Sequence, residues 1–386
     1  MKYPLASTSW DKEEIEAINR VVQRGNYSMG IYVSQFENQF ADYFKSRYAI
    51  MSNSGSSANL LMIASLFFKK EKPLVPGDEI IVPAVSWSTT YMPLQQYGLK
   101  VKFVDIDIET LNIDIDKLRD AISEDTRAVL AVNLLGNPND FESINDILRD
   151  KDIYLLEDNC ESMGAEFNSR MTGTFGVLGT FSSFFSHHIS TMEGGITVTD
   201  DEELYHIMLS LRAHGWTRNL PIVNKVTGKK STDTFSESFK FVLPGYNLRP
   251  LEMSGAVGLE QLKKLKAFIH YRRLNAEYFN YLFSDNDNFI IQKEIGKSSW
   301  FGFSFIIKRE SELKRDEILL KLNKNGIDVR PIVAGNFVKN EAVKYFNYTI
   351  HNELINAELV DNHGFFVGNH QYNIKEKIYY LHKILK

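Results

Sequence analysis

The stretch SHHISTMEGG, Ser186 to Gly195, contains the residues of this sequence best suited to chemistry. Two adjacent histidines, His187 and His188, follow the strand-like run TFSSFF and precede a second strand-like run, ITVTD. A histidine can move protons near neutral pH because its pKa lies there. If a strand continues through the pair, the two side chains point to opposite faces, which disfavours a shared metal ion. A catalytic histidine beside a structural one and a wholly structural pair both fit this pattern.

Glycine and serine open a helix after an earlier strand-like run. The segment SNSGSSANL, Ser52 to Leu60, places Gly55 where the backbone can approach a ligand closely and Ser56 in the first helical turn. Helix N-terminal amides together with serine hydroxyls form a cup suited to phosphate. An ordinary serine cap would give the same pattern, so the segment alone leaves both interpretations open.

Two further strand ends carry a tryptophan and a carboxylate. Trp87, in PAVSWSTT, could stack on a flat cofactor ring or lie at the rim of the core. Asp158, which follows Glu157 in LLEDNCES, could pair with a protonated pyridine nitrogen or belong to an ordinary turn. Because ligands gather at the carboxyl ends of strands in open parallel sheets, we expect these side chains to lie together.

Two later segments offer groups that could bind anions. PGYNLRP contains Asn247 and Arg249, and DVRPIVAGNF contains Arg330. Guanidinium groups suit carboxylates and diphosphates. For each single arginine, a surface ion pair is the competing interpretation.

These candidates are separated by alternating strand-like and helical segments. Five nearly continuous apolar runs, from YAIMS to DIYLLED, alternate with helical patterns, which is typical of a parallel sheet covered on both faces. We therefore predict an α/β fold with a large, mostly parallel sheet domain over residues 1–282. Residues 283–386 are predicted to form a smaller α+β domain, on which the N-terminal segment can pack.

Helical spacing is clearest from Asp11 to Arg24 and from about Pro250 to Leu282. The polar segment from Asn219 to Ser238 predicts a long loop.

Composition and charge exclude several classes of protein. The formal net charge is -5, and no Lys/Arg-dense stripe indicates a nucleic-acid partner. The longest apolar run, Leu60 to Phe68, is far shorter than the ~20 residues of a membrane helix. The single cysteine, Cys160, excludes an internal disulfide and an iron–sulfur cluster with four cysteine ligands. We expect a cytoplasmic protein with no metal site and no membrane partner.

Taken in order, these motifs resemble the sugar aminotransferase (DegT/DnrJ/EryC1/StrS) family of fold-type I pyridoxal phosphate enzymes. The resemblance extends from YPLASTSW to GNHQ and so covers nearly the whole chain. It implies a homodimer with shared active sites. The cofactor ligands that it implies are Gly55, Ser56 and Ser182 at the phosphate, Trp87, Asp158 and Glu161 around the ring, and Asn247 lent by the partner subunit. Glu161 stands where the family usually has glutamine.

The histidine pair departs from the family pattern. The family's Schiff-base lysine lies six residues before the glutamate of its EGG motif, and counting back from Glu193 gives His187. No lysine occurs from Asp152 to Asn224. An imidazole cannot form the covalent link to the cofactor, but it can still move protons. By resemblance to the nucleotide-sugar 3-dehydratases of this family, His187 is the expected catalytic base.

That branch of the family implies a particular reaction. Pyridoxal phosphate, in its amine form pyridoxamine phosphate, would be held without a covalent bond. The implied substrate is GDP-4-keto-6-deoxy-D-mannose, which loses its C3 hydroxyl. L-glutamate restores the amine and ammonia is released, in a pathway to colitose-type O-antigen sugars. The implied substrate-binding residues are His214, Arg218, Arg249 and Arg330.

Two alternatives remain open from the sequence. One is a nucleotide-sugar aminotransferase that works without a lysine. The other is a catalytically inactive protein that binds a cofactor or a nucleotide sugar.

Overall fold

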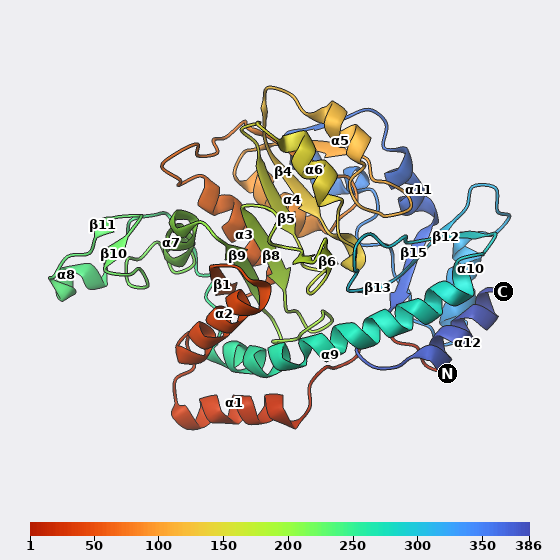
Figure 1. Ribbon diagram of the computed structural model, residues 1–386, viewed down its shortest axis with the longest axis horizontal. Coiled ribbons are helices and arrows are strands. Elements are labelled where there is room, and N and C mark those ends of the chain that lie inside the picture. The colour runs from red at the N-terminus through yellow and green to blue at the C-terminus, as the bar shows by residue number, and fades with distance from the viewer.

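The fold is built on one large sheet. A computed structural model describes residues 1–386, and its main sheet has eight strands in the order β1-β9-β8-β5-β4-β2-β3-β14. In that order the strands are β1 (Tyr48–Ser52), β9 (Gly195–Thr199), β8 (Leu178–Ser182), β5 (Tyr154–Asp158), β4 (Thr126–Val132), β2 (Glu79–Pro83), β3 (Lys100–Val104) and β14 (Tyr348–Ile350). The strands from β8 to β14 are parallel, and β9 is antiparallel to both of its neighbours. The predicted mostly parallel sheet is confirmed (Figure 1).

Helices cover both faces of this sheet. The strands are apolar runs in the sequence because both of their faces pack against these helices. In β4, Leu130 and Val132 enter the core that contains residues of α3 and α4, whereas Val129 and Ala131 enter the core that contains residues of α5 and α6. The strand is therefore apolar at every position from Ala128 to Val132 because both of its faces are buried there. The helices concerned are α3 (Gly55–Leu66), α4 (Ser88–Gln96), α5 (Ile115–Ala121) and α6 (Phe141–Leu148).

The two helices with the clearest sequence signals are present. Helix α1 spans Lys12–Arg24, with Asp11 as its N-cap and Gly25 as its left-handed C-cap at φ 72°. Helix α9 spans Glu252–Phe283. The other helices of eight or more residues are α2 (Ile31–Phe44), α7 (Glu202–Leu211), α10 (Arg315–Lys324), α11 (Ile355–His363) and α12 (Lys375–Leu385). None of the helices is both long and apolar enough to cross a membrane.

A second, smaller sheet lies at the far end of α9 (Figure 1). It is antiparallel, with strands β12 (Phe289–Ile291), β13 (Gly302–Ile307) and β15 (Gly364–Gly368). The N-terminal segment joins this region: Tyr3 is fully buried in its core and bridges to Ile327. Because α9 crosses residue 282 without a break and β14 returns to the large sheet, the division at residues 282 and 283 stays a prediction.

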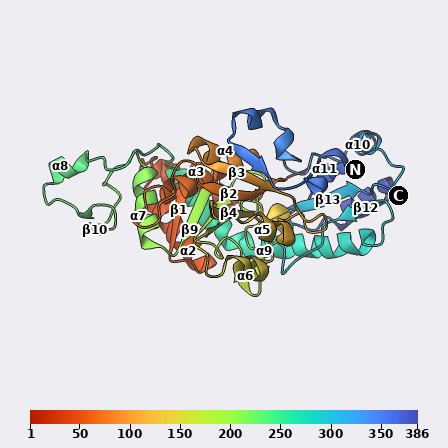
Figure 2. The same cartoon turned by 90° about the horizontal axis from the view of Figure 1, so that it is seen from above.

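The segment from Asn219 to Ser238 is not a plain loop. It contains a short hairpin, β10 (Val223–Asn224) with β11 (Gly228–Lys229), and the helix α8 (Thr234–Ser238). Figures 1 and 2 both show this arm extending away from the body of the protein. A second short hairpin pairs β6 (Glu166–Phe167) with β7 (Arg170–Met171), and short 3-10 turns span Leu134–Gly136, Phe337–Lys339 and Glu341–Tyr345.

Candidate functional site

A cavity of about 330 Å³ opens at the carboxyl ends of the central strands. Its wall includes the ends of β4, β5 and β8, the starts of α3 and α4, and the loop between β8 and β9. Eight of the residues singled out in the sequence line it: Gly55, Ser56, Trp87, Asp158, Glu161, Ser182, His187 and Arg330. The expectation that side chains from different strand ends lie together holds for these eight.

The start of α3 forms a tightly packed corner of the cavity. Ser54 caps the helix, and its Oγ accepts a 3.1 Å hydrogen bond from the amide of Ser57. A Cβ atom on Gly55 would lie only 2.7 Å from the Cβ of Ser182, so glycine permits this close approach. The first amides of a helix have no partner within the helix, and hydroxyls of Ser56 and Ser182 lie beside them. The corner can therefore bind an anion such as phosphate.

Asp158 is the last residue of β5, and three donors form hydrogen bonds with its carboxylate. Its Oδ2 accepts hydrogen bonds of 2.7 Å from Thr90 Oγ1 and 2.8 Å from Asn59 Nδ2. The amide of Cys160 donates to Oδ1 at 3.2 Å. These donors fix the orientation of the carboxylate in the cavity wall. A fixed carboxylate at this place is suited to a protonated ring nitrogen.

The neighbouring carboxylate, Glu157, has a separate, structural role. Strand alternation turns it away from Asp158, and it accepts hydrogen bonds from the amides of Gly173 at 2.6 Å and Gly176 at 2.8 Å. Burial raises the pKa of Glu157, and these amides oppose the rise. Of the adjacent acidic pair, only Asp158 lines the cavity.

Trp87 lies at the mouth of the cavity. It occupies the N-cap position of α4, directly after the β2 region, and its side chain is 57% exposed. This position excludes a role as a buried core tryptophan. A flat indole at the edge of a cavity is available to stack on a ring.

The two histidines lie in a loop, which corrects the expectation that a strand runs through them. Strand β8 ends at Ser182, and the chain turns back at His187, whose amide donates to Phe184 O at 2.9 Å. Strand alternation therefore cannot separate the histidines. The loop itself separates them, since His187 lines the cavity and His188 is 1% exposed.

The ring of His187 is fixed by packing. It lies 5.2 Å from the ring of Phe301 and 6.0 Å from that of Phe184, centre to centre, and its Nδ1 is buried with no hydrogen-bond partner in the chain. Burial lowers the pKa of His187 to about 3, and the positive charges of Arg330 and Arg272 add to this effect. The imidazole is therefore neutral at physiological pH, which is the form that accepts a proton.

His188 belongs to the interior. Its Nε2 lies 3.2 Å from the carbonyl oxygen of Ser299, and its ring is 5.8 Å from that of Phe301. Burial, followed by the charge of Arg272, lowers the pKa of His188 well below its ordinary value. These contacts favour a structural role.

Glu161 and Arg330 bring opposite charges to the cavity. One oxygen of Glu161 accepts a 3.1 Å hydrogen bond from the amide of Leu135. Burial raises the pKa of Glu161 to about 7, against the opposing charge of Arg330. Arg330 comes from the C-terminal part of the chain, where its backbone pairs with Phe366 and its guanidinium lies 4.5 Å from the centre of the Phe366 ring.

The remaining four predicted residues do not line this cavity. His214, Arg218, Asn247 and Arg249 form a separate surface cluster around Trp216. Arg218 lies 4.3 Å above the indole ring, and Arg249 Nε donates to Asn247 Oδ1 at 3.0 Å. Within one chain, none of these residues lines the cavity that contains His187.

Two important side chains were not predicted. Asn59 and Thr90 hold Asp158, yet neither attracted attention in the sequence. A helical repeat offered a signal, because Asn59 is three residues after Ser56 and Thr90 three residues after Trp87, on the same helix faces.

The two sheets, the long connecting helix and the cavity at the strand ends define a protein with the aminotransferase fold. Residues 8–377 match the DegT/DnrJ/EryC1/StrS aminotransferase family, and the chain belongs to that family.

Relatives within the family are similar over their whole length. The chain is 63% identical over 387 residues to the GDP-4-keto-6-deoxy-D-mannose 3-dehydratase of Escherichia coli O55:H7, with 100% of both chains covered. A structure of the E. coli enzyme with bound hydrated PLP superposes with a TM-score of 0.99 at 63% identity, again covering 100% of both chains. A second structure of an enzyme of that name holds a trapped PLP–glutamate geminal diamine, with the same TM-score, identity and coverage.

Proposed function

We propose that this chain removes the C3 hydroxyl of GDP-4-keto-6-deoxy-D-mannose to give GDP-4-keto-3,6-dideoxy-D-mannose, in the synthesis of colitose-type O-antigen sugars. Its cofactor is pyridoxal phosphate in the pyridoxamine form, and L-glutamate supplies the amine. The observation that carries the proposal is His187: a neutral imidazole lies in the cavity of a family that otherwise places a lysine there. Full-length sequence identity of 63% to an enzyme named for this activity supports the substrate.

The cavity has the donors and acceptors that the cofactor needs. The Gly55 and Ser182 corner would hold the phosphate, and the space is large enough only because Gly55 has no Cβ. Asp158, fixed by Thr90 and Asn59, would pair with the protonated ring nitrogen. Trp87 would cover one face of the ring at the mouth of the cavity.

When bound, the cofactor supplies an amine that can join to a sugar ketone and a pyridinium ring that takes up electrons. Asp158 keeps the proton on the ring nitrogen, so that the ring stays positively charged. His187 starts neutral and takes a proton from the carbon next to the ring. The same imidazole then delivers its proton to the departing C3 oxygen, which leaves as water. Because His187 cannot bond covalently to the cofactor, it remains free for both transfers.

The overall reaction balances in atoms and electrons. Replacing a C3 hydroxyl with hydrogen is a two-electron reduction of the sugar. Glutamate provides the two electrons as it becomes 2-oxoglutarate, and its nitrogen leaves as ammonia. The water formed from the C3 oxygen equals the water consumed in releasing the amine.

We also propose that the protein works as a homodimer with shared sites. Asn247, with Arg218 beside it in the Trp216 cluster, lies outside the cavity of its own chain and would reach the cavity of the partner subunit. Exposed apolar side chains gather on the same part of the surface, which supports an interface. They are Ile222 (69%), Val223 (71%), Phe235 (88%), Phe239 (66%) and Phe241 (55%). His214 and Arg249 of the cluster, with Arg330 in the cavity, complete the proposed substrate-binding residues.

The mass of the product tests the proposal. The protein is incubated with GDP-4-keto-6-deoxy-D-mannose, pyridoxal phosphate and glutamate, and the nucleotide sugar is analysed by mass spectrometry. We expect a product lighter by one oxygen, together with 2-oxoglutarate and ammonia. A product in which the ketone has become an amine would instead identify an aminotransferase that works without lysine. Unchanged sugar and unchanged glutamate would identify an inactive binding protein.

A further inference from the structure

The loop that carries His187 is held by hydrogen bonds to elements that lie away from the cavity. His187 itself has one backbone hydrogen bond, from its amide to Phe184 O at 2.9 Å, and its ring has none. The base of the loop is closed by Ser183 and Thr191, whose hydroxyl oxygens are 2.6 Å apart. The position of the imidazole therefore depends on how the rest of the loop backbone is held.

Part of that support comes through Ser190, three residues after His187. The amide of Ser190 donates to Gln261 Oε1 at 2.9 Å, and its carbonyl oxygen accepts from Trp10 Nε1 at 2.9 Å. Both backbone polar groups of one loop residue are thus taken by side chains from other elements. Gln261 comes from α9, and Trp10 lies in the N-terminal segment just before α1.

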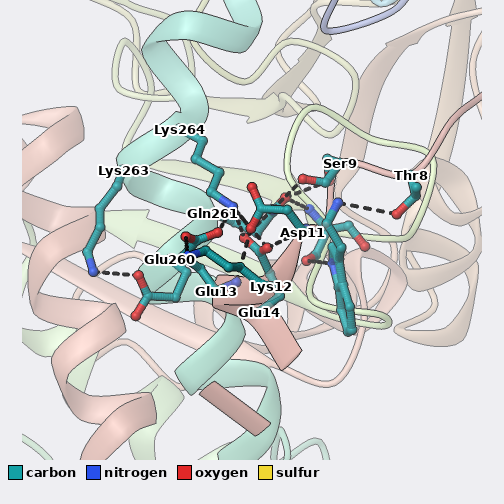
Figure 3. A network of polar contacts seen from close by, with 12 residues as sticks. Thr8, Ser9, Asp11, Lys12, Glu13, Glu14, Glu260, Gln261, Lys263 and Lys264 are labelled. Carbon is teal, nitrogen blue, oxygen red and sulfur yellow. Dashed lines mark hydrogen bonds and ion pairs between the residues drawn. The ribbon is translucent and has the colours of Figure 1, made fainter. Parts of the chain in front are cut away.

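The side chain of Gln261 is itself locked in orientation. It is fully buried, and its Nε2 donates to Ser9 O at 3.1 Å and to Glu14 Oε1 at 2.8 Å. Its Oε1 also accepts a 2.7 Å hydrogen bond from Ser9 Oγ. Figure 3 shows Gln261 between Ser9 and Glu14, with Lys264 of the same helix bonded to Glu14. These contacts fix the amide group so that its oxygen faces both Ser9 and the loop.

We propose that Trp10 is a positioning residue for His187, acting with Gln261 through Ser190. This inference rests on the proposed proton-moving role of His187. Trp10 is partly exposed, and the only hydrogen bond of its side chain goes to the histidine loop. Since proton transfer requires the base to lie within hydrogen-bond reach of its target, a small shift of the loop slows it. The N-terminal segment thereby fixes a group in the cavity.

The test uses Trp10→Phe, which keeps an aromatic ring and removes the N–H donor. Glutamate is mixed with the protein loaded with pyridoxal phosphate, and the absorbance change of the cofactor gives the rate of the first half-reaction. We expect this rate to fall about 3- to 10-fold, the effect of one lost hydrogen bond, with the affinity for pyridoxal phosphate unchanged. In the cofactor-free protein, we expect faster amide hydrogen exchange in residues 183–194.

Tyr3→Phe is the matched control. It also removes one hydrogen bond of the N-terminal segment, from Tyr3 OH to Gly368 O at 2.6 Å, but this bond does not involve the loop. We expect the half-reaction rate and the hydrogen exchange of residues 183–194 to match those of the unaltered protein.

A double-mutant cycle with His187→Asn separates the possible results. If Trp10 acts through His187, adding Trp10→Phe to His187→Asn causes no further loss of rate. An equal loss in both backgrounds, or no loss from Trp10→Phe alone, would overturn the inference and leave the proposed function standing. A His187→Asn protein with full rate would instead overturn the proposed role of His187.

Discussion

Gly55 and Ser182, which lie far apart in the sequence, meet so closely that a Cβ on Gly55 would lie 2.7 Å from the Cβ of Ser182. Cys160 Sγ would lie 3.3 Å from the same position. Helix α3 and strand β8 can therefore approach one another here only because residue 55 has no side chain. Such closeness brings the serine hydroxyl next to the amides at the start of α3, which makes one compact site for an anion.

Replacing Gly55 with alanine is expected to weaken cofactor binding about tenfold or more, because the methyl group must displace Ser182 from the anion site. Titration of the cofactor-free protein with pyridoxal phosphate, followed by absorbance, measures this. Gly25→Asn is the control, since asparagine tolerates the left-handed backbone at φ 72°, a Cβ at the end of α1 meets nothing within 4 Å, and the position is remote from the cavity. Equal affinity in the Gly55→Ala protein would argue against this corner as the phosphate site.

Asp158→Asn is expected to lower turnover on the order of 100-fold or more, because an amide cannot keep a proton on the ring nitrogen. Thr90→Val removes the 2.7 Å donor but leaves Asn59 in place, so we expect a smaller loss of about 3- to 10-fold. Thr90→Ser, which retains the hydroxyl, is the control. Steady-state turnover at saturating pyridoxal phosphate gives all three values. A Thr90→Val loss as large as that of Asp158→Asn would contradict this ranking.

Glu161 predicts a pH dependence of folding stability in the cofactor-free protein. Burial raises its pKa to about 7 in the folded state, above its ordinary value of 4.5, so the folded protein holds this proton more tightly than the unfolded chain does. The contribution of this proton to the free energy of unfolding is complete below pH 4.5. It is lost as the pH rises through about 7. The free energy of unfolding of Glu161→Gln should therefore vary less over this range than that of the unaltered protein.

Urea unfolding at several pH values between 4.5 and 7.5 measures this difference. Glu193→Gln removes an exposed carboxylate that lines the same cavity, and it controls for the loss of one negative charge. The prediction fails if Glu161→Gln follows the pH dependence of the unaltered protein.

The large sheet was predictable from the sequence because its strands are buried on both faces. Continuous apolar runs such as that of β4 arise from this burial, and they also locate the strand ends where Trp87 and Asp158 lie. Asn59 and Thr90 could not be ranked in advance. Helical spacing places them on the same faces as Ser56 and Trp87, but their importance comes from a contact with Asp158, which is far away in the chain and which that spacing does not encode.

The loop that contains His187 and His188 was not predictable from the sequence for a different reason. The run TFSSFF has the composition of a strand, but Phe184 and Phe185 are 40% and 48% exposed, and the strand ends before them. The two segments still exchange hydrogen bonds beyond Ser182, from Ser183 to Gly194 O and from Phe185 to Met192 O, before the chain turns at His187, whose amide donates to Phe184 O. Where such pairing stops being regular depends on the tertiary fold, so local composition overestimates the length of the strand.

The separate Trp216 cluster leads to a test of the shared sites. His187→Asn damages the cavity, whereas Asn247→Asp places a negative charge on the surface that would reach the partner's phosphate site, and each homodimer should be nearly inactive. If each site draws His187 from one subunit and Asn247 from the other, a mixed dimer has one fully intact site and one site with both defects. Refolding the two variants together in equal amounts gives half mixed dimers, so about a quarter of the unaltered activity should return. Mixing each variant with itself is the control. If Asn247 instead serves the cavity of its own chain, every site keeps one defect and no activity returns.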